Sequence, residues 1–259
     1  RASIGAGAAK GGAMSYLLRA LRYVLLWFDL LVLTLLLYAL TFLPASKRPL
    51  FSVLFRLWCR LFVRSLGVEL ALHQKNIKPL PEHYILIANH PSIFEDIGIP
   101  ALFDVVCLAK REVGDWWVFG RIARAAGTVF VRREDTESRK KAIDRMAAVV
   151  ASGKNFALYP EGGCTGRRIN PRFYYGAFEL SMRTAVPIVP VFLHYEAQES
   201  FEWGNQTGPE KVKDIFRAPN RQANYYVFDA IYPESFKDKQ SYMDHAHALY
   251  LQWQAKYFD

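Results

Sequence analysis

The sequence predicts an α/β domain, in which a mixed sheet is flanked by helices, with two apolar helices in front of it. Two observations support this fold class. Residues 14–66 are rich in leucine and aromatic side chains and contain one acidic residue, Asp29. After Gly67, short β-branched runs alternate with longer amphipathic stretches, the pattern of a sheet covered by helices. The chain of 259 residues is 52% apolar, which excludes a disordered protein.

The N-terminal region divides into a small-residue segment and an apolar helix. Residues 1–13 are rich in glycine and alanine and end before Met14, so we interpret them as an expression-tag remnant. Tyr23–Leu43 has 21 residues and one charge, and is long enough to cross a bilayer core of about 30 Å. Pro44 and Pro49 are expected to end this helix.

A second apolar stretch, Pro49–Leu66, carries Arg56, Arg60 and Arg64 at intervals of four residues. This spacing places the arginines on one helical face, as in a helix that lies in the membrane interface. Basic residues also flank the first helix on both sides. We therefore expect residues 14–66 to form a two-helix hairpin that enters one leaflet and returns to the cytoplasmic side. A spanning helix, a signal anchor and a cleaved signal peptide are the alternatives.

The charge distribution points to a membrane and away from nucleic acid. The net charge is +9, yet residues 65–259 contain 24 basic and 23 acidic side chains, so the surplus lies in the first 64 residues. A nucleic-acid-binding protein carries its surplus on the folded domain, so we expect no nucleic acid and expect membrane lipids as partners. Cys59, Cys107 and Cys164 are too far apart for a zinc site or a disulfide framework, and we expect no metal.

Residues 67–259 are expected to form the α/β domain. Its strands are predicted where β-branched and aromatic residues cluster, at Val68–His73, Tyr84–Ala88, Val105–Ala109, Thr128–Arg132, Phe156–Tyr159, Ile188–His194 and Tyr225–Tyr232. Its helices are predicted in the amphipathic stretches, at Ser92–Leu102, Asp115–Ala126, Thr136–Ser152, Phe173–Thr184 and Ser241–Tyr257. The polar stretch Glu196–Arg221, which contains glycine and proline, is expected to be a loop.

Candidate catalytic residues follow the second predicted strand. His90 lies where this strand meets a helix, and Glu95 and Asp96 follow within that helix. Ligand sites in open α/β sheets favour such junctions. A carboxylate can fix the imidazole tautomer, which makes His90 a candidate general base. The same pattern alone also suits a structural histidine.

A second polar cluster follows the strand at Phe156–Tyr159. The segment after Pro160 combines an acid, glycines and two arginines, namely Glu161, Gly162, Gly163, Cys164, Thr165, Gly166, Arg167 and Arg168. A proline-bracketed strand entry, Val186–Pro190, comes later.

Together these blocks resemble the glycerophosphate and lysophospholipid acyltransferase family, specifically its bacterial 1-acylglycerol-3-phosphate acyltransferase branch. That family has N-H-x4-D, a block with a lysine that ends in a glycine–strand–arginine run, F-P-E-G-T-R and V-P-I-x-P, in this order. The similar segments here are Asn89–Glu95, Lys110–Arg133, Tyr159–Cys164 and Val186–Pro190. The resemblance covers about Pro49–Tyr232.

The resemblance implies a glycerolipid acyltransferase-like fold and a membrane-associated O-acyltransferase of phospholipid biosynthesis. The donor would be acyl-CoA or an acyl carrier protein, the acceptor a lysophospholipid, most simply 1-acylglycerol-3-phosphate, and no cofactor would be needed. His90 would be the general base, Lys110 a phosphate contact and Glu161 the residue that positions the acceptor. Gly162 and Gly163 would let backbone amides approach the ligand. The expected location is the cytoplasmic face of the inner membrane.

The chain departs from the family pattern at two places. Glu95, followed by Asp96, stands where the family has aspartate, so either could partner His90. Gly163 and Cys164 stand where the family has Thr-Arg. Either the nearby arginines, Arg167 and Arg168, replace the missing arginine, or the acceptor lacks that phosphate, as a lyso-aminolipid would.

Two rival functions belong to other classes. In a thioesterase, Cys164 would be the nucleophile and His90 its base. In the other rival, the departures mark a catalytically silent, membrane-bound binding protein. Three aromatic residues, Trp116, Trp117 and Phe119, either line an acyl groove or pack in the core.

Overall fold

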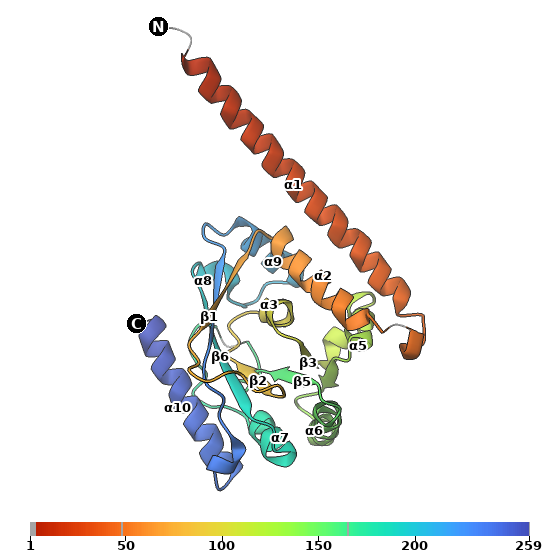
Figure 1. Ribbon diagram of the computed structural model, residues 1–259, viewed down its shortest axis with the longest axis vertical. Helices are drawn as coiled ribbons and strands as arrows, with labels where there is room; N and C mark the ends of the chain where they lie inside the picture. Colours follow the sequence, from red (N-terminus) through yellow and green to blue (C-terminus); the bar gives the residue numbers. More distant parts are fainter. Residues whose placement is uncertain (1–3, 48, 165, 259) are drawn as a thin grey trace.

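The computed structural model describes residues 4–47, 49–164 and 166–258. A mixed sheet with helices on both faces forms the body, and one long helix extends away from it (Figure 1). This confirms the predicted fold class.

The sheet has seven strands in the order β1-β7-β6-β2-β5-β3-β4. Neighbouring strands are parallel except for the antiparallel pair β6 and β7, so the sheet is mixed. The strands are β1 (Glu69–Gln74), β2 (Ile85–Ala88), β3 (Val105–Lys110), β4 (Val129–Val131), β5 (Asn155–Leu158), β6 (Ile188–Tyr195) and β7 (Gln222–Val227). Each overlaps a predicted strand, although the last begins three residues earlier than predicted and ends five residues earlier.

The central strand β2 separates two layers of core. Leu86 and Ala88 face one cluster of buried side chains, and Ile85 and Ile87 face the other, because neighbouring residues of a strand point to opposite faces. Since both faces are covered, the strand is apolar throughout. The helices of the first layer are α2 (Phe51–Ser65), α3 (Glu95–Leu102), α5 (Phe119–Ala125), α8 (Gln198–Phe201) and α9 (Gly208–Arg217). Those of the second layer are α6 (Thr136–Ala151), α7 (Gly176–Thr184) and α10 (Lys239–Tyr257).

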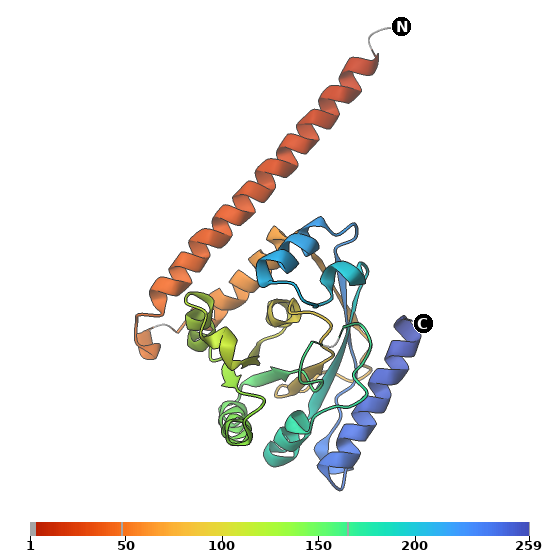
Figure 2. The same ribbon diagram turned by 180° about the vertical axis from the view of Figure 1, so that it is seen from behind.

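The N-terminal helices form a hairpin. Helix α1 (Ile4–Leu40) returns through a 3-10 turn (Ala45–Lys47) to α2, and the indole of Trp58 donates a hydrogen bond to the hydroxyl of Thr34 at 2.7 Å. The part of α1 from Met14 to Leu40 is long and apolar enough to cross a membrane, and most of it is exposed. Figure 2 shows from behind that the N-terminal part of α1 extends beyond the layered body, whereas Leu30, Leu33 and Leu37 near its other end are buried in the first cluster.

Two details of the N-terminal helix differ from expectation. Residues 4–13, interpreted from the sequence as part of a tag, continue α1 in the N-terminal direction. Residues 1–3 lie outside the described residues. The helix ends at Leu40 rather than Leu43, since the approach to Pro44 disfavours helical backbone.

Two corrections concern the body. The stretch Glu196–Arg221, expected to be a loop, contains α8 and α9, and Thr207 and Glu210 form a reciprocal capping box at the start of α9. The helix predicted at Asp115–Ala126 begins only at Phe119, as α5, and a separate short helix, α4 (Arg111–Gly114), precedes it. The two short helices approach each other closely at Gly120. A Cβ added there would lie 2.2 Å from the carbonyl oxygen of Gly114, so this position requires glycine. A 3-10 turn (Pro233–Ser235) precedes α10.

Candidate active site

His90 lies just beyond the end of β2, on a loop fixed to the neighbouring strand. The side chain of Asn89 donates to the carbonyl oxygen of Leu193 at 3.0 Å and accepts from its N–H at 2.7 Å. His90 is 4% exposed, and its ring stacks on Tyr159 with the centroids 4.0 Å apart. The imidazole is therefore held in one orientation at the carboxyl edge of the sheet.

The structure brings His90 and Glu95 together. Nδ1 of His90 lies 3.0 Å from Oε2 of Glu95, the first residue of α3. Oε2 also accepts from the N–H of Ser92, and Oε1 accepts from the hydroxyl of Tyr195. When Glu95 is ionised, it accepts the proton on Nδ1, which leaves the lone pair of His90 on Nε2.

Burial controls the protonation of this pair. Desolvation lowers the pKa of His90, so the neutral imidazole is favoured near neutral pH. Desolvation also raises the pKa of Glu95, whereas hydrogen bonds from Tyr195 and Ser92 lower it. The net effect raises the pKa of Glu95 well above its ordinary value. With Glu95 ionised, the neutral imidazole beside it has the arrangement required of a general base.

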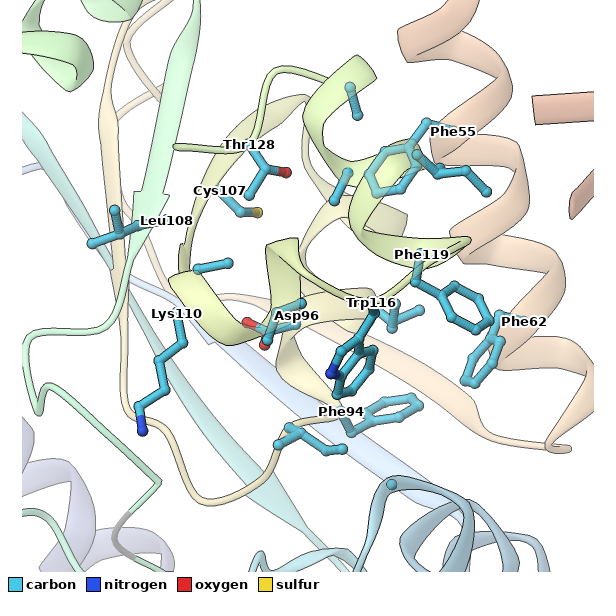
Figure 3. A pocket seen from close by; sticks show the side chains of 18 of the residues that line it. Phe55, Phe62, Phe94, Asp96, Cys107, Leu108, Lys110, Trp116, Phe119 and Thr128 are labelled. Carbon is cyan, nitrogen blue, oxygen red and sulfur yellow. The ribbon is translucent and has the colours of Figure 1, made fainter. Parts of the chain in front are cut away.

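Asp96 has a different environment from Glu95. Its side chain is half-buried and lies on the wall of the cavity beside the site (Figure 3), rather than being a solvated acid at the start of the helix. Burial raises the pKa of Asp96, and the charge of His90 opposes this shift. Asp96 therefore acts on His90 through its field, and Glu95 through direct contact.

Glu161 connects two loops of the site. Its Oε1 accepts from the backbone N–H of His90 at 2.8 Å, and its Oε2 accepts from the N–H of Asn170 at 2.8 Å. The side chain is 2% exposed and is not among the residues lining the cavity. The structure thus places Glu161 behind His90 rather than on the acceptor side.

Cys164 lies between His90 and the cavity. Its Sγ is 3.3 Å from Nε2 of His90 and donates to the carbonyl oxygen of Ser92 at 3.4 Å. Gly162 has a φ of +74°, and an added Cβ would lie 2.6 Å from the ring of Tyr174, so this turn requires glycine. Burial raises the pKa of the Cys164 thiol, which disfavours the thiolate.

A cavity of about 1660 Å³ adjoins the catalytic pair. Its wall is mostly apolar, and Phe94, Trp116 and Phe119 converge on it in Figure 3. Trp117 also lines it, so all three predicted groove aromatics border the cavity. Its lining also includes Gly163 and the cations Lys110 and Arg133. Among the described residues, no cluster of His, Cys, Asp and Glu could hold a metal ion.

Comparisons with known proteins find similarity to acyltransferases. The sequence profile described as Acyltransferase matches residues 69–194, which include His90, Glu95 and Glu161. The chain is 32% identical over 107 residues to a lyso-ornithine lipid O-acyltransferase of Rhizobium meliloti (strain 1021), covering 41% of this chain and 36% of that protein. It is 31% identical over 139 residues to lysophosphatidylcholine acyltransferase 2 of Homo sapiens, covering 51% of this chain and 24% of that protein. The Acyltransferase profile covers just under half of the chain, and these similarities agree with the predicted resemblance to the glycerophosphate and lysophospholipid acyltransferase family.

A solved structure shares the fold of this chain. The 1-acyl-sn-glycerophosphate acyltransferase PlsC from Thermotoga maritima superposes with a TM-score of 0.63 at 15% identity, covering 89% of this chain and 97% of that chain. A lyso-ornithine lipid O-acyltransferase of Rhodobacter capsulatus is 27% identical over 164 residues, covering 61% of this chain and 57% of its own. The matches span less than two thirds of the length of these curated relatives.

The arginines predicted to replace the missing family arginine do not line the cavity. Arg167 forms an ion pair with Glu202 at 2.6 Å and is exposed, and neither Arg167 nor Arg168 is among the lining residues. Arg133 lies there instead and donates to the carbonyl oxygen of Gly162. The sequence contained a signal for Arg133, since it ends the block that begins at Lys110.

Proposed function

We propose that this acyltransferase moves a fatty acyl group from acyl-CoA or an acyl carrier protein to the free hydroxyl of a single-chain lyso-lipid. One observation carries the proposal: a buried His90–Glu95 pair adjoins an apolar cavity of about 1660 Å³. The general base and a space suited to an acyl chain lie on either side of Cys164.

The proposed reaction is a direct transfer. Nε2 of His90 removes the proton of the acceptor hydroxyl as its oxygen attacks the thioester carbonyl carbon. The tetrahedral oxyanion collapses, the bond from carbon to sulfur breaks, and the leaving thiolate takes the proton from His90. Glu95 stabilises the imidazolium between these steps. The turn at Gly162 and Gly163 can bring backbone amides close to the oxyanion.

Two headgroups of the acceptor lipid are candidates. The sequence predicts 1-acylglycerol-3-phosphate, and Lys110 and Arg133 are cations on the cavity wall that suit a phosphate. Asp96 and Glu134 lie on the same wall, and this mixture of charges suits a headgroup with both an anion and an ammonium. The named lyso-ornithine relatives support such a lyso-aminolipid as the second candidate.

A panel of substrates tests the function. The purified protein is incubated with labelled acyl-CoA or acyl carrier protein and with lysophosphatidate, lysophosphatidylcholine or a lyso-ornithine lipid, and products are identified by mass. We expect acyl transfer to at least one lyso-lipid. Release of free fatty acid with every acceptor would contradict the proposal.

The cation that contacts the acceptor can be identified with two matched variants. Arg133→Gln should raise the acceptor KM about tenfold and leave the donor KM unchanged, since a charge-assisted contact is lost from one substrate only. Arg167→Gln should change either KM less than about twofold, because its exposed ion pair with Glu202 is worth little. The reverse ranking would restore Arg167 as the replacement for the family arginine.

The thioesterase rival is favoured by one observation, the 3.3 Å contact between Cys164 and His90. Burial opposes it, because the pKa of Cys164 is raised and its thiol proton is directed to Ser92. Cys164→Ser should therefore keep acyl transfer within about fivefold of wild type. Mass spectrometry should find no acyl-enzyme after rapid quenching. An acyl group trapped on Cys164 would establish the rival mechanism.

We propose further that the hairpin of α1 and α2 anchors the enzyme on the cytoplasmic face of the inner membrane. Most of the described apolar residues of α1 are exposed, and Arg19, Arg22 and Lys47 flank its apolar part. A hairpin in one leaflet keeps all of these cations beside anionic headgroups.

Cysteine labelling tests the topology. In a variant without the natural cysteines, Arg19→Cys and Lys47→Cys should both react with a membrane-impermeant maleimide in inverted vesicles and not in right-side-out vesicles. Lys140→Cys, on the exposed surface of α6, is the matched control for the cytoplasmic side. Labelling of Arg19→Cys and Lys47→Cys from opposite sides would establish a spanning helix instead.

A further inference from the structure

Glu95 has a contact that its position in the motif does not account for. The hydroxyl of Tyr195, at the end of β6, donates to Oε1 of Glu95 at 2.5 Å, while Oε2 receives His90. Glu95 and Tyr195 are each 0% exposed, so neither group is solvated. Both oxygens of this carboxylate therefore have protein partners.

The ring of Tyr195 is clamped by two aromatic side chains. It stacks on Phe201 of α8, with centroids 4.4 Å apart and planes 7° apart, and Phe94 meets its edge at 6.1 Å. The segment after α8 is tied to the loop of His90 by a hydrogen bond from the N–H of Trp203 to the carbonyl oxygen of Pro91 at 3.0 Å. Helix α8 thus fixes the direction of the Tyr195 hydroxyl through the stacking of Phe201.

We propose that Tyr195 is a positioning residue for the reaction, and that its hydroxyl keeps Glu95 ionised and aimed at Nδ1 of His90. The proposal rests on the acyltransferase function proposed above. It also explains how glutamate can stand where the family has aspartate, because Tyr195 holds the second oxygen of a longer side chain.

The role of Tyr195 depends on which atom of the Glu95–His90 pair carries a proton. If Glu95 is ionised, Nδ1 carries the imidazole proton and Nε2 can accept the proton of the substrate hydroxyl. If Glu95 is protonated, it donates to Nδ1, the imidazole proton moves to Nε2, and the base is lost. Burial raises the pKa of Glu95, and the hydrogen bond from Tyr195 is the strongest influence that lowers it.

The groups that face this pair come from several elements. They are Ser92, Asp96, Tyr159, Glu161, Cys164, Arg133 and Tyr225. Of these, Ser92 donates directly to a Glu95 oxygen, through its backbone N–H. Tyr195 donates to the other Glu95 oxygen through its side-chain hydroxyl.

The first test is Tyr195→Phe in the full-length enzyme. Without the hydroxyl, the active form with ionised Glu95 is disfavoured, so the acidic limb of the kcat/KM profile should move upward by about one pH unit. At neutral pH, kcat should fall about tenfold and the acceptor KM should change less than twofold, with activity partly recovered at high pH. The matched control is Tyr242→Phe, which removes another buried hydroxyl, bonded to the carbonyl oxygen of Ile231, and should leave the pH profile unchanged.

A double-variant cycle separates positioning from a purely structural role. A carboxylate one methylene shorter, in Glu95→Asp, cannot keep both Tyr195 and His90 as partners. Tyr195→Phe should therefore shift the pH profile in wild type and leave it unchanged in the Glu95→Asp background. A shift of equal size in both backgrounds, or of zero in both, would overturn the proposal.

An NMR measurement keeps the test independent of turnover. With ¹⁵N-labelled histidine, neutral His90 should carry its proton on Nδ1 in wild type and on Nε2 in Tyr195→Phe, whether or not any lyso-lipid is accepted. An unchanged tautomer would refute the role of Tyr195, whereas failure of the substrate panel alone would refute the proposed function. If Tyr195→Phe does not fold, 3,5-difluorotyrosine can be placed at position 195, where its hydroxyl is a stronger donor and should move the acidic limb of the rate profile to lower pH. An unmoved acidic limb would equally refute the role of Tyr195.

Discussion

His90→Ala should lower acyl transfer by a factor of about 10²–10⁴, the usual cost of losing a general base. The reason is the geometry of Nε2, which faces Cys164 and the cavity, while Nδ1 is held by Glu95. The loss should appear in kcat, because the imidazole contributes to the transition state and not to binding of either acyl chain. Initial rates with the best pair of substrates measure it.

A matched control accompanies this variant. His194→Ala removes a histidine from β6 that contacts Phe258 and lies outside the site, so its kcat should remain near that of wild type. Thermal unfolding must show that His90→Ala is folded, because the ring that it removes also stacks on Tyr159. A folded His90→Ala enzyme with near-normal turnover would end the assignment of His90 as the base.

Much of the sheet could be predicted because its strands are short apolar runs with clear ends. Ile85–Ala88 is apolar at every position, which indicates a strand buried on both faces, and polar residues begin at Asn89. The strand therefore places His90 at the edge of the sheet without any knowledge of the fold. The next strand of the site, β5, places Glu161 near the same edge for the same reason.

The remaining parts of the site depend on contacts between distant residues. Arg133 and Arg167 are both arginines close to a motif, and only the ion pair with Glu202 shows that Arg167 is directed elsewhere. Tyr195 lies one hundred residues from Glu95, and no local pattern relates the two. Helix α8, which clamps Tyr195, is four residues long and too short to give a periodic signal.

The partner of His90 is decided by comparing Glu95→Gln with Asp96→Asn, two variants that each remove one negative charge. Glu95→Gln should lower kcat on the order of 10²-fold or more, because the amide cannot stabilise the imidazolium and no longer fixes the tautomer. Asp96→Asn should lower kcat less than about fivefold, since Asp96 influences His90 through its field and not through a hydrogen bond. Its loss should also lower the pKa of His90 and move the acidic limb of the rate profile downward, because the Asp96 charge favours the imidazolium. Steady-state rates across pH with both variants distinguish the two carboxylates, and equal small losses of kcat would mean that neither one orients the ring.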